Sequence, residues 1–472
     1  MGYGVISMLL GGGRRRAVLY GGFALYAAGV ALFSGPGLDH WWGTWAAGGY
    51  AIAAAITAWG RPWSGRAAVA VSVAGALIGP AIWLMTQEPT PPDVAVVARS
   101  GVLLLHHGSP YLPLSGLTGW LDYNPYLPVM ALFGLPGALG LPGKTWPWLI
   151  AATFLLLYAT FRVTLRPGMP RRGRAAFGYA AFWLACPVMA FPLTMGITDP
   201  PVIALTCLGL ALLARGTGAR EGRGWEAGGF TGRELAGRGL TGRGLAGRGW
   251  NRDFAAAALV LGVACAMKYT AWPALVIVAV MVAARDGWRA AVRFTAVVLA
   301  AAAALVAALA PAALGNPASL LRNTVDYPLG LTGATSPAAS PLPGHLLATL
   351  GSGGHLAALL LLAAAGIAIA ASLVVAPPAT PAAAARRVAI GLTALFLLAP
   401  ATRFGYFIYP ISLYAWAMLA DRQRGTGPRD SGDQWSLGRV TGRLPARYER
   451  RLHRVIGHSD GWDARQMPDP VT

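Results

Sequence analysis

The chain has little charge and almost no lysine. Only 12% of its 472 residues are charged, whereas soluble proteins average about 25%, and the only lysines are Lys144 and Lys268. The three cysteines lie apart in apolar segments and show no CxxC spacing, which argues against a zinc site or a disulfide framework. These absences exclude an ordinary water-soluble domain and a cysteine-held scaffold.

The short motifs of nucleotide and hydrolytic chemistry are also missing. There is no P-loop, GxGxxG, HExxH or GxSxG in a convincing context. The energy for any reaction would therefore come from an activated lipid donor or from an ion gradient. His106 and His107 could ligate a metal, but neighbouring histidines on a helix point in different directions and no clear third ligand accompanies them. We expect no cofactor, and the need for a divalent cation stays open.

Hydrophobic residues, in contrast, make up 55% of the sequence. They form long Ala, Leu and Val runs without the alternation of a barrel strand, and about 20 such residues cross a bilayer as a helix. We predict an all-α, polytopic transmembrane bundle of 11 to 13 spans within residues 1–420. The expected spans are 17–33, 43–59, 67–85, 126–141, 146–161, 175–190, 200–214, 254–284 (long and broken), 290–313, 355–375, 388–399 and 407–419.

The net charge of +20 comes from arginines that cluster between these spans. The positive-inside rule explains this distribution better than nucleic-acid binding does, and it places both termini in the cytoplasm. We predict that residues 215–253, with a five-residue repeat at 231–250, form a cytoplasmic Gly/Arg-rich loop. Residues 421–472 are predicted to form a basic, disordered cytoplasmic tail. One inconsistency remains. Five arginines at 162–174 require an odd number of crossings after Asp93, yet two spans are expected there, so one run is re-entrant or a short span is missed.

Residues 93–111 organise the chain. Val94, Val97, Gly101, Leu104 and Leu105 recur at helical spacing, which predicts an amphipathic helix lying along the external membrane surface. Its first residue, Asp93, has two compatible interpretations. It could cap the start of the helix, or it could act as a general base at the mouth of an apolar cavity.

Four further polar residues could bind a substrate. Lys268 interrupts an apolar stretch, where a charge costs about 2.5–3.5 kcal/mol at the bilayer centre; it could snorkel to the surface or bind a phosphate headgroup. Arg403, flanked by aromatic residues, could anchor the chain at the interface or pair with a phosphate. Asp199 could cap a helix that begins with proline. Arg322 could form an external ion pair with Asp326.

The order of these features resembles the GT-C superfamily of integral-membrane glycosyltransferases, in particular its polyprenol-phosphate-mannose-dependent branch. The resemblance covers 93–419, and Tyr111 and Tyr269 within it join the substrate-binding candidates. The matching segments are Asp93-Val94-Ala95-Val96-Val97, Leu103-Leu104-Leu105, Gly108-Ser109-Pro110-Tyr111, Asn124-Pro125-Tyr126-Leu127-Pro128, Gly262-Val263-Ala264-Cys265-Ala266-Met267-Lys268-Tyr269-Thr270 and Arg403-Phe404-Gly405-Tyr406-Phe407-Ile408-Tyr409-Pro410.

This resemblance implies an inverting transfer of a mannose-like sugar from a polyprenyl-phosphate donor to a glycolipid or glycan acceptor at the external face of the cell membrane. Asp93 would be the base, and Lys268 and Arg403 would neutralise the phosphate. Two alternatives stay open. A transporter or lipid flippase would move its substrate into vesicles without transfer, and a membrane scaffold would depend on 231–250 and the tail but not on Asp93.

Overall fold

The computed structural model describes residues 12–35, 37–86, 90–141, 145–226, 251–328, 331–334 and 338–425, without the side chains of 217–226. The repeat at 231–250 and the tail beyond 425 lie outside them. The chain divides into units Met1–Gly427 and Pro428–Thr472, close to the expected boundary after residue 420. The described part of the first unit is helical and contains no strand, only an isolated bridge between Ala339 and Thr402. The predicted all-α class is confirmed.

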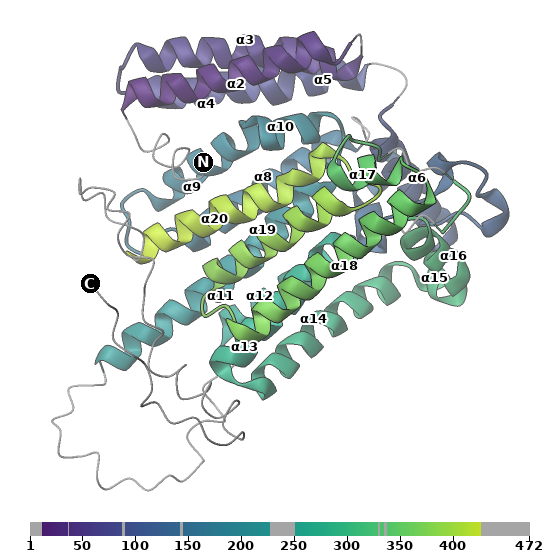
Figure 1. Ribbon diagram of the computed structural model, residues 1–472. Helices are drawn as coiled ribbons and strands as arrows, with labels where there is room; N and C mark the ends of the chain where they lie inside the picture. The colour runs from purple at the N-terminus through teal and green to yellow at the C-terminus, as the bar shows by residue number, and fades with distance from the viewer. Residues whose placement is uncertain are drawn as a thin grey trace, which may run out of the picture. The chain divides into compact units, whose positions relative to one another are not determined.

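The long helices pack side by side, as Figure 1 shows. They are α2 (Gly13–Phe33), α3 (Leu38–Ala58), α4 (Ser64–Val73) continued by η1 (Ala74–Ile78) and α5 (Gly79–Met85), α6 (Pro92–His107), α8 (Trp146–Thr164), α9 (Arg172–Ala185), α10 (Pro187–Thr194), α11 (Asp199–Glu226), α12 (Arg252–Met267), α13 (Trp272–Asp286), α14 (Trp288–Leu309), α18 (Ser352–Val375), α19 (Pro381–Leu398) and α20 (Ile408–Arg424).

Short helices connect them at one end of the bundle. These are η2 (Leu114–Gly116), η3 (Trp120–Asp122), η4 (Pro128–Phe133), α7 (Leu135–Ala138), η5 (Tyr269–Ala271), α15 (Pro311–Gly315), α16 (Pro317–Leu321), η6 (Arg322–Asp326), α17 (Pro343–Ala348) and η7 (Phe404–Phe407). Many begin with proline, whose missing N–H costs nothing in a first helical turn.

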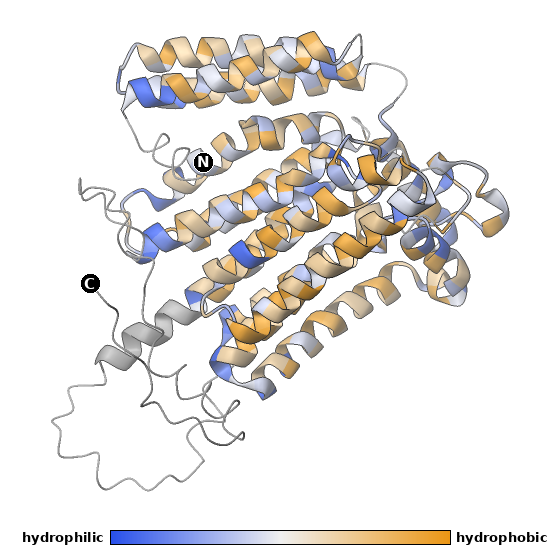
Figure 2. Ribbon diagram, in the orientation of Figure 1, coloured by the Kyte–Doolittle hydropathy of each residue, from blue (hydrophilic) through white to orange (hydrophobic). Residues whose placement is uncertain are grey.

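Among the described residues, eight helices are long and apolar enough to cross a membrane, or nine if the pair α9 and α10, bent by 63°, counts as one span. Figure 2 shows apolar residues along most of their lengths. A polytopic bundle is therefore supported. The expected count of 11 to 13 also included α12 and α20, which are shorter than 18 residues, and the Trp- and Gly-rich α3.

The span predicted at 126–141 is wrong. That stretch forms η4 and the four-residue α7, which turn back at the same end of the bundle as α6. Glycine and two prolines within it break any longer helix. Only α8 then crosses between Asp93 and the arginines at 162–174, so the crossing count becomes odd and the inconsistency disappears. The broken span at 254–284 is confirmed, because α12 and α13 run in opposite directions around a turn at Lys268.

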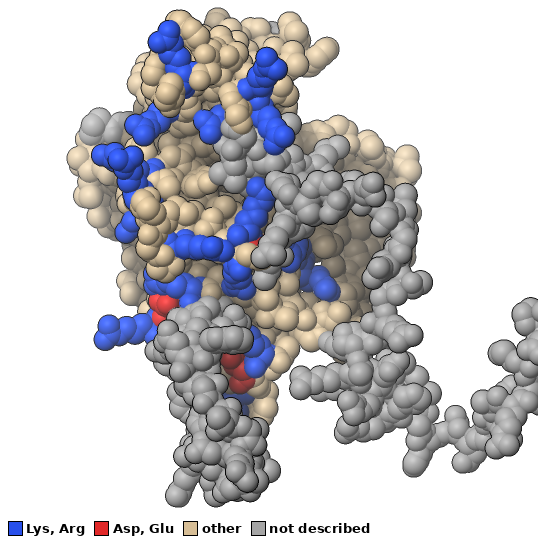
Figure 3. Space-filling view, turned by 90° about the vertical axis from the view of Figure 1, so that its left-hand side faces the viewer, with Lys and Arg blue, Asp and Glu red and all other residues tan. Residues whose placement is uncertain are grey.

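The two ends of the bundle differ in charge. We call one the arginine-rich end. It carries Arg162, Arg172 and Arg424 at or near helix termini, together with Arg215 and Arg386, which pair with Asp253 at the start of α12 and with Asp421 near the end of α20. Figure 3 shows this face, on which basic side chains clearly outnumber acidic ones over the described surface. We call the opposite end the Asp93 end. The starts of α6 and α11, the α12–α13 turn and the segment before η7 all lie there.

Helix α6 presents one apolar face to the bundle, with Val94, Val97 and Leu104 buried as predicted, whereas Leu105, which was predicted on the same face, is 45% exposed. Gly101 on that face touches Gly134 so closely that a Cβ on Gly101 would lie 2.2 Å from the Gly134 carbonyl carbon. Gly108, in the left-handed conformation at φ +63°, ends the helix. These contacts hold α6, and with it Asp93, against the short segment η4–α7.

Candidate functional site

A polar cavity of about 110 Å³ lies at the Asp93 end. Its lining comes from four parts of the chain that are far apart in sequence. Asp93 lies in the first turn of α6, Asp199 begins α11, Lys268 and Tyr269 form the α12–α13 turn, and Arg403 precedes η7. Five of the seven predicted site residues therefore line one cavity.

The deepest part of the cavity is a buried ion pair. Lys268 Nζ donates to Asp199 Oδ1 at 2.6 Å, and the two side chains are 6% and 0% exposed. The Tyr409 hydroxyl donates to the same carboxylate oxygen at 2.6 Å and lies 2.6 Å from the Thr270 hydroxyl. Lys268 thus neither snorkels nor stands free for a phosphate. Its positive charge is held by Asp199, because two ions this well buried are stable only as a hydrogen-bonded pair.

Asp93 and Arg403 form a second, looser pair. Arg403 Nη1 lies 3.4 Å from Asp93 Oδ2, and the side chains are 29% and 23% exposed. Burial is the largest influence on the pKa of Arg403 and lowers it, but Asp93 together with the neighbouring tyrosines outweighs burial, so the pKa rises above its usual value. Arg403 is therefore a permanent cation. A long contact at partly exposed side chains contributes little to stability, on the order of 0–1 kcal/mol, so a ligand can displace either partner.

The four charges of the cavity cancel, yet one oxygen remains unused. Asp199 Oδ2 is buried and has no hydrogen-bond partner among the described residues. A buried acceptor without a donor costs about 1–3 kcal/mol. Asp199 itself is among the residues that line the cavity.

Aromatic rings form the rest of the lining. Lys268 Nζ lies 5.3 Å from the ring centre of Tyr126 and 5.5 Å from that of Tyr406, within the range of cation–π attraction. Tyr123 and Tyr327 stack with centroids 4.5 Å apart, and both line the cavity together with Trp120. Burial raises the pKa of Tyr126 well above 10, so its phenol stays neutral.

Asn124 holds this lining in place. The Asn124 side chain donates to Ser100 Oγ on α6 at 3.0 Å and accepts from the backbone N–H of Tyr126 at 3.1 Å. The backbone N–H of Asn124 donates to Asn323 Oδ1 at 2.7 Å. One buried amide thus joins α6, the segment that carries Tyr126, and η6. Such a satisfied network fixes the geometry of a site more firmly than apolar packing does.

Two predicted site residues do not line the cavity. Tyr111 is buried behind it and donates its hydroxyl to the Tyr126 carbonyl oxygen at 2.9 Å, so it positions the lining and does not touch a ligand there. Arg322 pairs with Asp326 at 3.5 Å, as predicted, but the pair lies on the surface outside the cavity. Residue spacing cannot separate these two from the others, because it does not show which way a side chain points.

Several residues of the site were not singled out from the sequence. Tyr123, Tyr126, Tyr327 and Tyr406 line the cavity, and Tyr409 does not line it but donates to Asp199. Three of them lay within segments already matched to the GT-C pattern, and Tyr409 stands directly before a proline at the start of α20. Tyr123 and Tyr327 carry no sequence signal, since they meet only through folding.

The described residues include no group of three or more His, Cys, Asp or Glu side chains placed to hold a metal ion. His106 and His107 lie exposed at the end of α6. A comparison with known proteins found no matching family, no matching curated protein and no matching solved structure.

Proposed function

We propose that this chain is a membrane glycosyltransferase that moves a mannose-like sugar from a polyprenyl-phosphate donor to a hydroxyl of a glycolipid or glycan. One observation carries the proposal. Two carboxylates, two cations and a ring of tyrosines from distant segments converge on one cavity at the end of an apolar helix bundle. Lipid-borne substrates reach such a site from the bilayer, and a sugar suits aromatic walls with buried hydrogen-bond acceptors.

Asp93 is the better base of the two acids. Asp199 is completely buried and already holds Lys268 and Tyr409, whereas Asp93 is partly exposed and has one loose partner. A donor phosphate that binds Arg403 draws this cation away from Asp93 and frees the carboxylate to accept a proton. Phosphate binding and base activation are then a single event.

The proposed transfer needs no nucleotide, because the phosphate of the lipid donor is the leaving group. Asp93 accepts the proton of the acceptor hydroxyl, the hydroxyl oxygen attacks the anomeric carbon from the face opposite the leaving group, and the bond from that carbon to the phosphate oxygen breaks. Polyprenyl phosphate leaves with the electron pair. Arg403 stabilises the charge that develops on it, which lowers the barrier more than it strengthens ground-state binding.

The size of the cavity adds a condition. Ligand pockets usually measure about 300–1,000 Å³, whereas this one measures about 110 Å³. A sugar phosphate therefore enters only when the contact between Arg403 and Asp93 opens. The weak, partly exposed pairing of these two side chains is consistent with such an opening.

Charge also supports an orientation and a location. The arginine-rich end faces the cytoplasm under the positive-inside rule, so the cavity faces outward from a cell membrane. Both described termini of the first unit, Arg14–Arg16 at the start of α2 and Arg422 and Arg424 at the end of α20, lie at the arginine-rich end.

The test is transfer in membranes that contain the full chain, with radiolabelled polyprenyl-phosphate mannose as donor. We expect Asp93→Asn to lower kcat at least about 100-fold, the usual contribution of a general base. Arg403→Ala should raise the KM for the donor. Asp326→Asn is the matched control, because this carboxylate pairs with an arginine at 3.5 Å at the same end but outside the cavity.

Full transfer by Asp93→Asn would refute the proposal. Uptake of the donor into vesicles without loss of sugar to any acceptor would identify a transporter or flippase instead. If no activity is detected but deletion of 231–250 and the tail abolishes the cellular phenotype, while Asp93→Asn leaves it intact, the scaffold alternative holds.

A further inference from the structure

A second and larger cavity lies at the other end of the bundle. It is a groove of about 1,070 Å³ between the N-terminal helices α2 and α4 and the helices α8 and α9. Both sides belong to the first unit. Two contacts join the sides of the groove. The Tyr50 hydroxyl donates to the Ala185 carbonyl oxygen at 2.6 Å, and the ring centroids of Tyr20 and Phe182 lie 6.2 Å apart.

The groove walls are apolar along most of their length. Phe154, Leu155 and Phe177 line them, and Leu155 and Phe177 keep 62% and 56% of their surface exposed. Helices α2, α4–α5 and α8 are all apolar enough to cross a membrane. Exposed apolar walls between helices that can cross a membrane favour contact with a hydrocarbon chain over contact with water.

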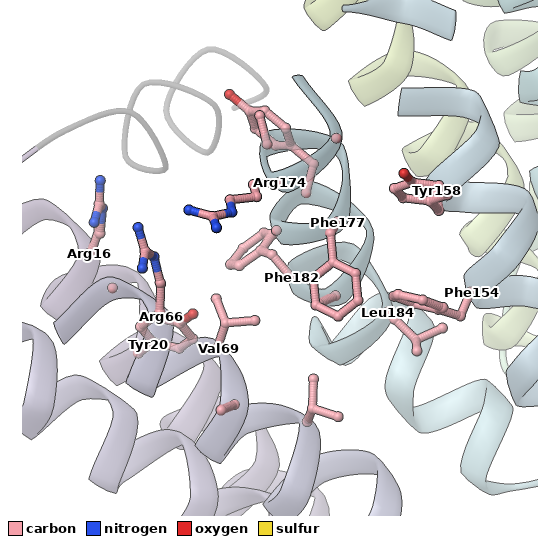
Figure 4. Close-up of a pocket in the computed structure, with 18 of the residues that line it drawn as sticks. Arg16, Tyr20, Arg66, Val69, Phe154, Tyr158, Arg174, Phe177, Phe182 and Leu184 are labelled. Atoms are coloured by element: carbon pink, nitrogen blue, oxygen red, sulfur yellow. The ribbon is translucent and has the colours of Figure 1, made fainter. Parts of the chain in front are cut away.

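One end of the groove is strongly basic. Arg16, Arg66 and Arg174 line it, and no Asp or Glu does. Figure 4 shows these three side chains gathered at one end, with the rings of Phe177, Phe182 and Phe154 further along. None of the three arginines has a carboxylate within ion-pair distance in the described part of the chain.

The backbone adds to the positive charge. Each arginine lies within the first turn or so of its helix, Arg16 on α2, Arg66 on α4 and Arg174 on α9. The N-terminal turn of a helix carries partial positive charge and attracts anions. The Arg16 guanidinium packs over Gly65, and its Nε is buried with no hydrogen-bond partner in the described part of the chain. Three cations and three helix starts therefore converge on one apolar groove.

We propose that this groove binds one anionic phospholipid from the leaflet next to the arginine-rich end, with its headgroup phosphate at Arg16, Arg66 and Arg174 and its acyl chains along the aromatic walls. The site is separate from the Asp93 cavity and does not depend on the proposed transfer. Three arginines that have no carboxylate partner among the described residues select an anionic headgroup over a zwitterionic one. The length of the apolar wall selects a lipid over a soluble phosphate.

The experiment measures lipid binding to the purified full chain in detergent by native mass spectrometry. Phosphatidylglycerol is compared with phosphatidylcholine of the same chains, and soluble glycerol 3-phosphate is added as a competitor. We expect one tightly bound phosphatidylglycerol that glycerol 3-phosphate does not displace. An arginine near an anionic lipid surface strengthens binding about fivefold, so Arg66→Gln/Arg174→Gln should weaken it about 30-fold. Both side chains are exposed, so the variant should fold.

The matched control is Arg14→Gln/Arg15→Gln, which removes the same charge from the start of α2 at exposed positions that do not line the groove. A second variant, Gly178→Leu, should block the chain itself, because nothing lies within 4 Å of a Cβ at this groove position. It should weaken binding while every arginine stays in place.

Equal binding of the two lipids, or equal weakening by both arginine variants, would overturn the proposal, since only general surface charge would then be at work. Unchanged binding in Gly178→Leu would also overturn it. So would occupation of the groove by polyprenyl phosphate in preference to phosphatidylglycerol.

Discussion

The buried pair of Lys268 and Asp199 makes the sharpest prediction about stability. Because both side chains are almost completely buried and 2.6 Å apart, removing one partner leaves an uncompensated charge in an apolar site. Such losses cost about 3–5 kcal/mol. Lys268→Met and Asp199→Asn should each lower the free energy of unfolding by that order. The double variant leaves no orphan charge and should cost clearly less than the sum, with a coupling of at least about 2 kcal/mol.

The assay is equilibrium unfolding of the purified chain in mixed micelles of a mild detergent and dodecyl sulfate, followed by far-ultraviolet circular dichroism. Arg215 and Asp253 are the matched control pair. Arg215 Nε donates to Asp253 Oδ2 at 3.0 Å, but the side chains are 42% and 23% exposed at the arginine-rich end. The same cycle there should give less than about 1 kcal/mol. Single variants of the buried pair that cost less than the exposed pair, or strictly additive effects, would refute the reasoning.

Three further predictions follow from the geometry. Gly101→Ala should lower the free energy of unfolding by about 1–3 kcal/mol, because its Cβ would lie 2.2 Å from the Gly134 carbonyl carbon. The control is Gly48→Ala on α3, which has open space around it and should be neutral or stabilising. The same unfolding assay measures both variants, and equal effects would contradict the close contact. Asp122 accepts hydrogen bonds from the Gly119 amide and from Thr118, which lower its pKa. The pKa of Asp122 is lower in the folded than in the unfolded chain, so this stabilisation is present above about pH 4 and is lost as the pH falls through the folded pKa. Amide hydrogen exchange in 117–123, corrected for intrinsic rates, should therefore rise below about pH 4. An Asp122→Asn variant should lack this pH dependence. The native cysteines are all buried, so an impermeant thiol reagent applied outside intact cells should label Ser115→Cys at the Asp93 end and spare Pro170→Cys at the arginine-rich end; the reverse pattern would invert the proposed orientation.

Much of the fold follows from composition and periodicity alone. Long apolar runs specify helices because a backbone in lipid must satisfy its own hydrogen bonds, and the spacing of Val94, Val97 and Leu104 specifies the buried face of α6. The stretch at 126–141 shows the limit of that logic. It is apolar enough for a span, but its glycine and prolines produce short turns, which apolar content by itself does not register.

The candidate site divides in the same way. Sequence singled out Asp93, Asp199, Lys268 and Arg403 because a charge within or beside an apolar run is costly and needs a reason. Only the tertiary structure decided the pairing, Lys268 with Asp199 and Arg403 with Asp93. It also placed Arg322 outside the cavity, stacked Tyr123 on Tyr327, and opened the basic groove at the far end. These contacts join residues up to 310 positions apart. The local sequence shows where a charge lies in an apolar run and is costly to bury. The packing of the helices determines which residue pairs with that charge and offsets the cost.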